Sequence, residues 1–275
     1  MALDQDEIKE LEEGGKEMSF LDHLEQFRWH LFRSAIAVAA GAAVVFGFQD
    51  EVFKYIVLAP KNADFITFRV LCKLGPSFCY SPPHFDLVTR ELGEQLSESM
   101  YVCLWLGLIL ASPFVLYEIW KFIRPGLYKN ERQAIGGIVW ICTLLFILGV
   151  CFGYFIIAPF GIAFLASYTV GAINTPTLSS YISYITMLTM PIGLIFELPV
   201  IIYFMTKIGV ITPTFLKTYR RYAVVIIAIV AGVITPPDAL SQILVMLPLL
   251  LLYELSIGVS RREYNRKAKI LAEDI

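Results

Sequence analysis

Long apolar runs separated by polar segments are the dominant pattern in this chain. They cover about residues 31–48, 100–117, 134–158, 181–204, 222–234 and 243–259. A helix of about 20 apolar residues is long enough to cross the hydrocarbon core of a bilayer. At 1.5 Å per residue the fifth run reaches only roughly 20 Å, against a core of about 30 Å, and the sixth is also short. The pattern predicts an all-α membrane protein with six transmembrane helices, of which the fifth and sixth are short.

Composition supports this class over a soluble one. The 275 residues are 57% hydrophobic and 17% charged, whereas soluble domains average about 45–50% apolar and 25% charged residues. The formal net charge of −2 hides an uneven distribution, with acids crowded before residue 18 and bases gathered in particular loops. That distribution indicates membrane topology and not nucleic-acid binding.

Basic residues mark alternate connections. They precede the first run, and they fill the turn between the second and third runs, the loop between the fourth and fifth, and the tail after residue 259. The connections around 160–180 and 235–242 have no Lys or Arg. Because short cytoplasmic loops carry the excess of Lys and Arg, we expect both termini on the cytoplasmic side of a bacterial inner membrane. The loop 49–98 is then outside.

The chain divides into three parts on these grounds. Residues 1–18 are acidic and poor in apolar residues, which predicts a flexible tail and no secretory signal. Residues 19–262 form one membrane domain, opened by an amphipathic helix over 19–34 that merges with the first span. Residues 263–275 are predicted as a cytoplasmic tail. Within the domain, 160–180 is expected to be an outside loop with an interfacial piece at 164–168.

The positions of the cysteines and the absence of catalytic motifs restrict the possible functions of this chain. Cys72 and Cys79 bracket a Gly-Pro turn in the outside loop, where disulfides persist, so this pair is a disulfide candidate; two free thiols packed in the loop are the alternative. The other cysteines lie in apolar runs and are interpreted as packing residues. The sequence lacks H-E-x-x-H, G-x-S-x-G and P-loop motifs. We therefore predict no enzymatic activity, no cofactor and no metal site.

Glu197 is the strongest single candidate for a functional residue, because it lies inside the fourth apolar run. An ionisable group at the centre of a span costs about 2.5–3.5 kcal/mol on insertion scales, so it should face protein or water. Pro191 and Pro199 are expected to bend this span and present Glu197 to a hollow. The alternative interpretation is structural: Glu197 is hydrogen-bonded and holds neighbouring spans together. Glu118 and Glu254 lie nearer the span ends and are interpreted as reaching water.

Two other function classes were weighed. An ion-coupled secondary transporter would use Glu197 as a proton site and would show an internal repeat with paired broken helices, but the sequence shows no such repeat. A purely structural membrane scaffold would be indifferent to changes in the basic turn between the second and third runs.

That turn, YEIWKFIRPGLYKNER over 117–132, combines bases, aromatics and a helix-breaking Pro125-Gly126 pair. Glu131 opens the third helix. An acid in a first turn is favourable to the helix dipole by itself, but here it stands at the mouth of a rigid aromatic loop. A carboxylate in that setting suits a cationic peptide.

Four motifs in order carry a family resemblance. HLEQFRWHL precedes the first span, FIRPGLYKNER joins the second and third, FELP lies in the fourth, and TPPDALSQ joins the fifth and sixth. From about residue 19 to 262 the chain resembles TatC, the multispanning receptor subunit of the twin-arginine protein translocase. The resemblance implies a curved, cupped fold that binds twin-arginine signal peptides on the cytoplasmic face. It also implies self-association in a receptor complex and work with single-span TatA and TatB subunits, driven by the proton-motive force, in contact with membrane lipid.

The resemblance also implies site residues. In the usual N-terminal motif, H-L-E-E-L-R, the second acid is associated with signal-peptide binding, and it is Gln26 in this chain. The outside loop with its cysteines looks like an elaboration on the family pattern. The implied signal-peptide residues are Glu131, Phe122, Pro125, Gly126, Leu127, Glu25, Gln26 and Arg28. The implied intramembrane or partner-contact residues are Glu197, Asp238 and Gln242.

Overall fold

The computed structural model describes residues 20–75, 82–123, 135–171, 174–235 and 239–273. These residues form helices joined by turns, and the only β-pairing among them is an isolated bridge between Val88 and Thr177. The helices are α2 Phe20–Gly47, α3 Gln49–Val52, α4 Ile66–Leu74, α5 Glu94–Ile123, α6 Ile135–Phe152, α7 Ala158–Ser167, α8 Leu178–Ile195, α9 Leu198–Lys207, α10 Pro213–Thr218, α11 Arg220–Ile234 and α12 Ala239–Glu273. Turns of π-helix, η1 Phe53–Val57 and η6 Gly153–Ile157, and a 3₁₀ turn, η2 Ala59–Lys61, complete the order.

Five helical stretches are long and apolar enough to cross a membrane, which confirms the class predicted from the hydropathy pattern. They cover Leu24–Gly47, Glu94–Ile123, Gly137–Ser167, Leu178–Lys207 and Ser241–Ala268. The expected fifth span is α11, whose 15 residues fall short of a membrane-length helix. It packs beside α12. The arrangement with six spans therefore stays a prediction.

Two expectations about helix ends were wrong. The sixth run is not a short helix, because α12 has 35 residues and continues through residue 263 without a break. Its polar end, RREYNRKAKI, has no Gly or Pro and is rich in good helix formers. The third span continues through η6 and α7 to Ser167, so residues 164–167 of the expected interfacial piece belong to a helix and Tyr168 ends it. Pro159 stands in the first turn of α7, directly after the π-helical turn η6, and the carbonyl of Phe155, four residues earlier, accepts a bond from the hydroxyl of Thr67.

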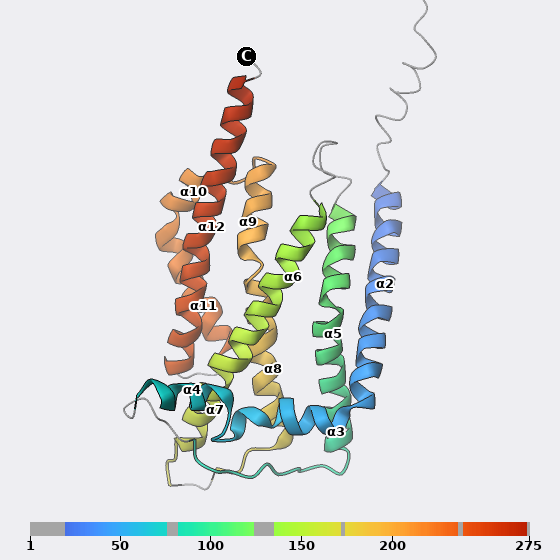
Figure 1. The fold of residues 1–275 in the computed structure, drawn as a ribbon, viewed down its shortest axis with the longest axis vertical. Coiled ribbons are helices and arrows are strands. Elements are labelled where there is room, and N and C mark those ends of the chain that lie inside the picture. Colours follow the sequence, from blue (N-terminus) through green and yellow to red (C-terminus); the bar gives the residue numbers. More distant parts are fainter. Residues whose placement is uncertain (1–19, 76–81, 124–134, 172–173, 236–238, 274–275) are drawn as a thin grey trace, which may run out of the picture.

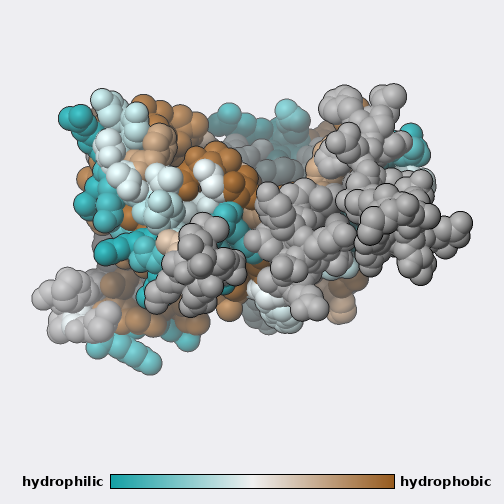
Figure 2. Space-filling model, turned by 90° about the horizontal axis from the view of Figure 1, so that it is seen from above, coloured by the Kyte–Doolittle hydropathy of each residue, from teal (hydrophilic) through white to brown (hydrophobic). Residues whose placement is uncertain are grey.

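The helices stand side by side in a row that starts with α2 (Figure 1). Contacts run from α2 to α5, from α5 to α6, from α6 to α8 and from α9 to α12. The start of α2, the end of α12 and α10 lie at one end of the molecule, here named the termini end. The short helices α3 and α4 lie at the opposite end, here named the α4 end. Seen from the termini end, hydrophilic residues gather over the half that carries α10 and α12 (Figure 2).

The fourth expected span, predicted to bend at Pro191 and Pro199, is interrupted just before Pro199, whereas Pro191 lies inside α8. α8 ends at Ile195 and α9 begins at Leu198, with Glu197 between them. Pro199 stands in the first turn of α9 and cannot donate to the carbonyl of residue 195, so the backbone bonds are interrupted there. The break places Glu197 at the joint of two helix segments.

The connection over 49–98 is more ordered than a polar loop. α5 already begins at Glu94, whose carboxylate accepts bonds from the backbone N–H of Arg90 at 2.6 Å and of Ser179 at 3.0 Å. The hydroxyl of Tyr154 donates to the carbonyl of Ile56 at 2.6 Å, and that of Tyr181 to the carbonyl of Val57 at 3.0 Å. These bonds attach η1 to the spanning helices and hold the α4 end against them.

Candidate functional site

α2 and α5 approach most closely at two glycines. A Cβ atom on Gly107 would lie 2.5 Å from the backbone nitrogen of Ala42, and one on Gly41 would lie 2.8 Å from the carbonyl oxygen of Gly107. Backbone atoms cannot move aside as side chains can, so the two helices can cross at this distance only where both residues are glycine. Small residues of this kind let membrane helices pack by van der Waals contact. The crossing sets where the N-terminal motif lies relative to α5.

Further toward the termini end, His30 of α2 pairs with Glu118 of α5 through Nδ1 and Oε2. The Glu118 side chain is 4% exposed and that of His30 15% exposed. Glu118 was expected to reach water, and this was wrong: α2 covers it. A buried carboxylate in an apolar helix needs such a partner because an unpaired charge there is costly.

Phe122, in the last turn of α5, completes this contact. Its ring centroid lies 5.2 Å from that of Phe27 and 6.1 Å from that of His30. The structure therefore brings the predicted site residue Phe122 next to the N-terminal motif. On the same end of α2, the predicted site residues Glu25, Gln26 and Arg28 are exposed to the surroundings. All three residues therefore lie on the surface at the termini end.

Several predicted site residues lie outside the described residues. Pro125, Gly126, Leu127 and Glu131 belong to 124–134, which joins the described ends of α5 and α6. Asp238 lies outside them as well.

The cysteine prediction can be followed for four of the five thiols. Cys72 is disulfide-bonded, whereas Cys103, Cys142 and Cys151 are free. Cys79 lies outside the described residues, so its pairing with Cys72 stays a prediction.

Glu197 forms the second polar centre of the spans. It is 8% exposed and shares a hydrogen bond with the thiol of Cys142 from α6. The indole Nε1 of Trp120 from α5 donates to the same sulfur at 3.1 Å. Oε1 of Glu197 has no hydrogen-bond partner among the described residues. One oxygen of this carboxylate thus remains unsatisfied inside the protein.

The expectation that Glu197 faces a hollow does not hold in this structure. An apolar groove of about 900 Å³ runs between α6, α9 and α12. It is lined by Phe196, Pro199 and Val200, which are close to Glu197 in the sequence. Glu197 does not line it and instead packs toward Cys142. The turn at residues 196–197 points successive side chains in different directions, which sequence periodicity does not resolve.

The remaining predicted polar residues join α11 to α12. Nε2 of Gln242 donates to the carbonyl of Ala228 at 3.1 Å, and a Cβ on Gly232 would lie 3.0 Å from that nitrogen. Glu254 pairs with Arg220 at 2.6 Å and is half exposed, in keeping with its interpretation as a solvated acid. Among the described residues, no group of three His, Cys, Asp or Glu side chains could hold a metal ion.

His30 and Glu118 are the residues that sequence reasoning missed. Glu118 is an acid in a largely apolar helix, and that was the available signal, whereas His30 lies among other polar residues of the amphipathic start of α2. Their partnership depends on how α2 crosses α5, because 88 residues separate them along the chain.

Fold and polar groups together define a polytopic helical membrane protein with exposed polar residues at one end and a buried carboxylate within its spans. Residues 22–248 match the family model "Sec-independent protein translocase protein (TatC)". A TatC of Blattabacterium sp. subsp. Periplaneta americana is 39% identical over 253 residues, covering 89% of this chain and 95% of that protein. TatCy of Bacillus subtilis is 37% identical, with 94% of each chain covered.

Solved structures agree with the sequence relatives. A crystal structure described as the twin-arginine translocase receptor TatC matches with a TM-score of 0.67 and 34% identity, over 88% of this chain and 99% of that chain. A second, in DDM, matches with a TM-score of 0.70 over 86% and 99%. The chain belongs to the TatC family of Sec-independent protein translocase components, which are not enzymes. The comparisons offer no support for an ion-coupled transporter.

Proposed function

We propose that this chain is the receptor for twin-arginine signal peptides and that it receives them at the termini end, on the cytoplasmic face of a bacterial inner membrane. The observation that carries the proposal is the contact of α2 with α5 at that end. Phe27 lies against Phe122 at 5.2 Å, so the N-terminal motif stands beside the end of α5 from which the segment 124–134 departs. Residues of both predicted recognition motifs thereby belong to one neighbourhood.

The chemistry of the ligand fits the residue types. A signal peptide with two adjacent arginines needs carboxylates that accept bidentate bonds and aromatic rings that accept cations. Glu131 is the proposed main charge partner, and Phe122 offers an aromatic face. Glu25 is an exposed carboxylate on α2, and Gln26 beside it offers an amide oxygen. Pro125, Gly126 and Leu127 are proposed to shape the connecting turn, and Arg28 to meet lipid or peptide at its rim.

The proposed topology has both termini in the cytoplasm. It rests on the basic residues of the termini-end connections and on the finding that α2 begins and α12 ends at the same end of the molecule (Figure 1). The α4 end, with its disulfide-bonded Cys72, then lies outside, where disulfides persist.

The proposed partners are single-span TatA- and TatB-type subunits, a second copy of the chain within a receptor complex, and folded cargo moved by the proton-motive force. Glu197 is the proposed contact for a polar residue on a partner helix, because one of its oxygens has no hydrogen-bond partner among the described residues; since that oxygen is buried, the contact requires the helices beside it to separate. Asp238 and Gln242 are proposed to contribute at the α11–α12 turn.

A photocrosslinking experiment tests the recognition site. A photoreactive residue placed at position 128, with Glu131 kept, should capture a signal peptide with two arginines, and a peptide with two lysines should be captured at least about tenfold less, since one charge-assisted contact is worth about 1.5–3 kcal/mol. Glu131→Ala should abolish transport at normal membrane levels. Glu51→Ala, an exposed acid on α3 at the opposite end, is the control. Full transport by Glu131→Ala would contradict the proposal.

A further inference from the structure

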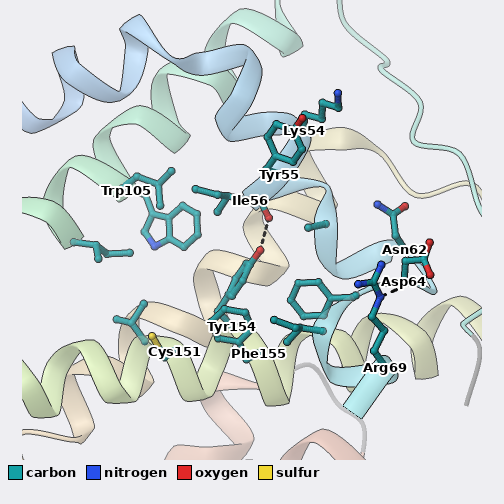
Figure 3. Close-up of a pocket in the computed structure, with 16 residues that line it drawn as sticks. Lys54, Tyr55, Ile56, Asn62, Asp64, Arg69, Trp105, Cys151, Tyr154 and Phe155 are labelled. Carbon is teal, nitrogen blue, oxygen red and sulfur yellow. Dashed lines mark hydrogen bonds and ion pairs between the residues drawn. The ribbon is translucent and has the colours of Figure 1, made fainter. Parts of the chain in front are cut away.

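A separate cavity of about 890 Å³ opens at the α4 end, between α5, α6 and the short helices (Figure 3). One end of it is apolar, where Trp105 of α5 faces Tyr154 and the Cys151 side of α6. The other end is polar and carries Lys54 and Arg69. The signal-recognition neighbourhood at the termini end shares no residue with it. The cavity therefore needs its own explanation.

The polar end has more positive than negative charge. Lys54 extends over the ring of Tyr55, 4.9 Å from its centroid, and no ion pair of Lys54 occurs among the described residues. Arg69 is 64% exposed and has its Nε 3.9 Å from Asp64, which is 91% exposed. At that distance and exposure Asp64 holds the guanidinium weakly. The two cations with one acid leave a surplus of one positive charge for an anionic group.

The apolar end holds an unsatisfied donor. Trp105 is 6% exposed, and its indole Nε1 has no hydrogen-bond partner among the described residues. A buried N–H without an acceptor is costly, and most buried indoles find one. That nitrogen is itself inaccessible, so Trp105, which lines the cavity, contributes the apolar surface of its ring there. The ligand must then combine an apolar body with an anionic group further out.

We propose that the cavity binds one anionic phospholipid. Its acyl chain lies along the apolar end against the ring of Trp105, and its phosphate lies at the polar end, which carries Lys54 and Arg69. The volume suits this occupant, because ligand pockets measure about 300–1,000 Å³. A membrane-spanning partner helix about 10 Å wide and 30 Å long would need on the order of 2,000 Å³, which the cavity does not offer.

A bound lipid would join α4 to the spans. α4 and the residues before it already contact η6: the hydroxyl of Thr67 bonds the carbonyl of Phe155, and the ring of Phe65 stacks on that of Phe155 at 5.8 Å. Phe65 and Phe155 both line the cavity. Filling it would bury their remaining faces, so the lipid acts as a structural ligand of the α4 end. This role does not depend on signal-peptide recognition.

Fluorescence quenching tests the proposal directly. Of the four tryptophans, Trp105 is kept and the others are changed to Phe, and the protein is placed in phosphatidylcholine vesicles containing phosphatidylglycerol with brominated acyl chains. We expect quenching at low mole fractions of the brominated lipid. Each cation near the headgroup should contribute about a fivefold preference over brominated phosphatidylcholine. Equal quenching by the two brominated lipids, or no quenching, would overturn the proposal.

Charge variants sharpen the test. Lys54→Gln with Arg69→Gln should remove the preference, whereas Lys73→Gln, an exposed cation of the same α4 helix outside the cavity, should keep it. Native mass spectrometry of the chain with all four tryptophans gives the same comparison by counting retained phosphatidylglycerol. An unchanged preference in the double variant would contradict phosphate binding at these residues. Displacement of the brominated lipid by a signal peptide would assign the cavity to the peptide instead.

Discussion

α2 and the α8–α9 pair are both membrane-length segments, yet they are held in different ways. Only 6% of the apolar window of Leu24–Gly47 is buried inside the protein, against 61% of that of Leu178–Lys207. α8 and α9 contact α5, α6, η6, α11 and α12, whereas α2 packs mainly on α5. The comparison shows that α2 is held by one extensive contact with a single helix, and the central pair by the burial of many apolar side chains against several helices.

The difference bears on the proposed function. The side chains of Leu188 and Thr189 in α8 are fully buried, so a change there affects packing with several helices at once. On α2, the contacts that hold it are the crossing at Gly41 and Gly107 and the pair of His30 with Glu118. A helix held locally can change its position when these contacts change, while the rest of the protein stays folded. The positions of the proposed recognition residues on α2 therefore depend on the Gly41–Gly107 crossing and on the His30–Glu118 pair.

The largest effect is expected from Glu118→Ala. It leaves His30 without its partner, and breaking a buried pair by removing one member costs roughly 3 kcal/mol. We expect a lower thermal unfolding midpoint in detergent and a loss of arginine-dependent crosslinking from position 128. Glu118→Gln keeps a hydrogen bond and should lose less. If His30→Ala combined with Glu118→Ala is destabilised by the full sum of the single changes, the two residues are not coupled.

Gly107→Ala should have the next largest effect. Its Cβ would meet the backbone of Ala42 at 2.5 Å, so α2 must move, at a cost of about 1–3 kcal/mol. The measurement is disulfide crosslinking between Phe27→Cys and Phe122→Cys, which should slow several-fold. Gly47→Ala is the matched control on α2, because nothing lies within 4 Å of its Cβ. Equal crosslinking rates in Gly107→Ala and the control would rule out the glycine crossing as the device that positions α2.

On the central pair, Glu197 should separate partner binding from signal recognition. Its free oxygen can take a donor from a partner helix, a contact worth about 1.5–3 kcal/mol. Glu197→Ala should therefore weaken crosslinking to a single-span partner by about tenfold or more, and Glu197→Gln should keep much of it. Both variants should bind signal peptide normally. Partner crosslinking left intact by Glu197→Ala, or signal binding lost as in Glu131→Ala, would show that this division of roles is wrong.

The smallest effect on either region is expected from Cys72→Ser. Cys72 lies in α4, remote from the α2–α5 contact at the termini end, so signal-peptide binding should stay within about twofold of the unmodified protein. Peptide mass spectrometry without reduction should show Cys72 linked to Cys79. A different partner for Cys72 would refute the predicted pair.

Much of the fold followed from the sequence because the bilayer imposes a simple rule. An apolar run of membrane length must be helical, since every backbone group needs an internal partner. The runs therefore predicted the spanning helices, and four motifs in order predicted the family. The ends of the helices were less predictable: the polar tail of α12 and the residues after Pro159 can be helical or not, and hydropathy does not distinguish the two.

The neighbours of each helix were decided only by the tertiary structure. A period of 3.6 residues tells which side chains share a face, but it does not tell which helix covers that face. Glu118 therefore looked solvated until α2 was found over it, and Glu197 was expected at a hollow until the break before α9 was seen to direct it to Cys142. The sequence by itself determined that acids occur in the spans. The crossing of α2 over α5 and the break at residues 196–197 decided what those acids touch, because both set side-chain direction through contacts distant in sequence.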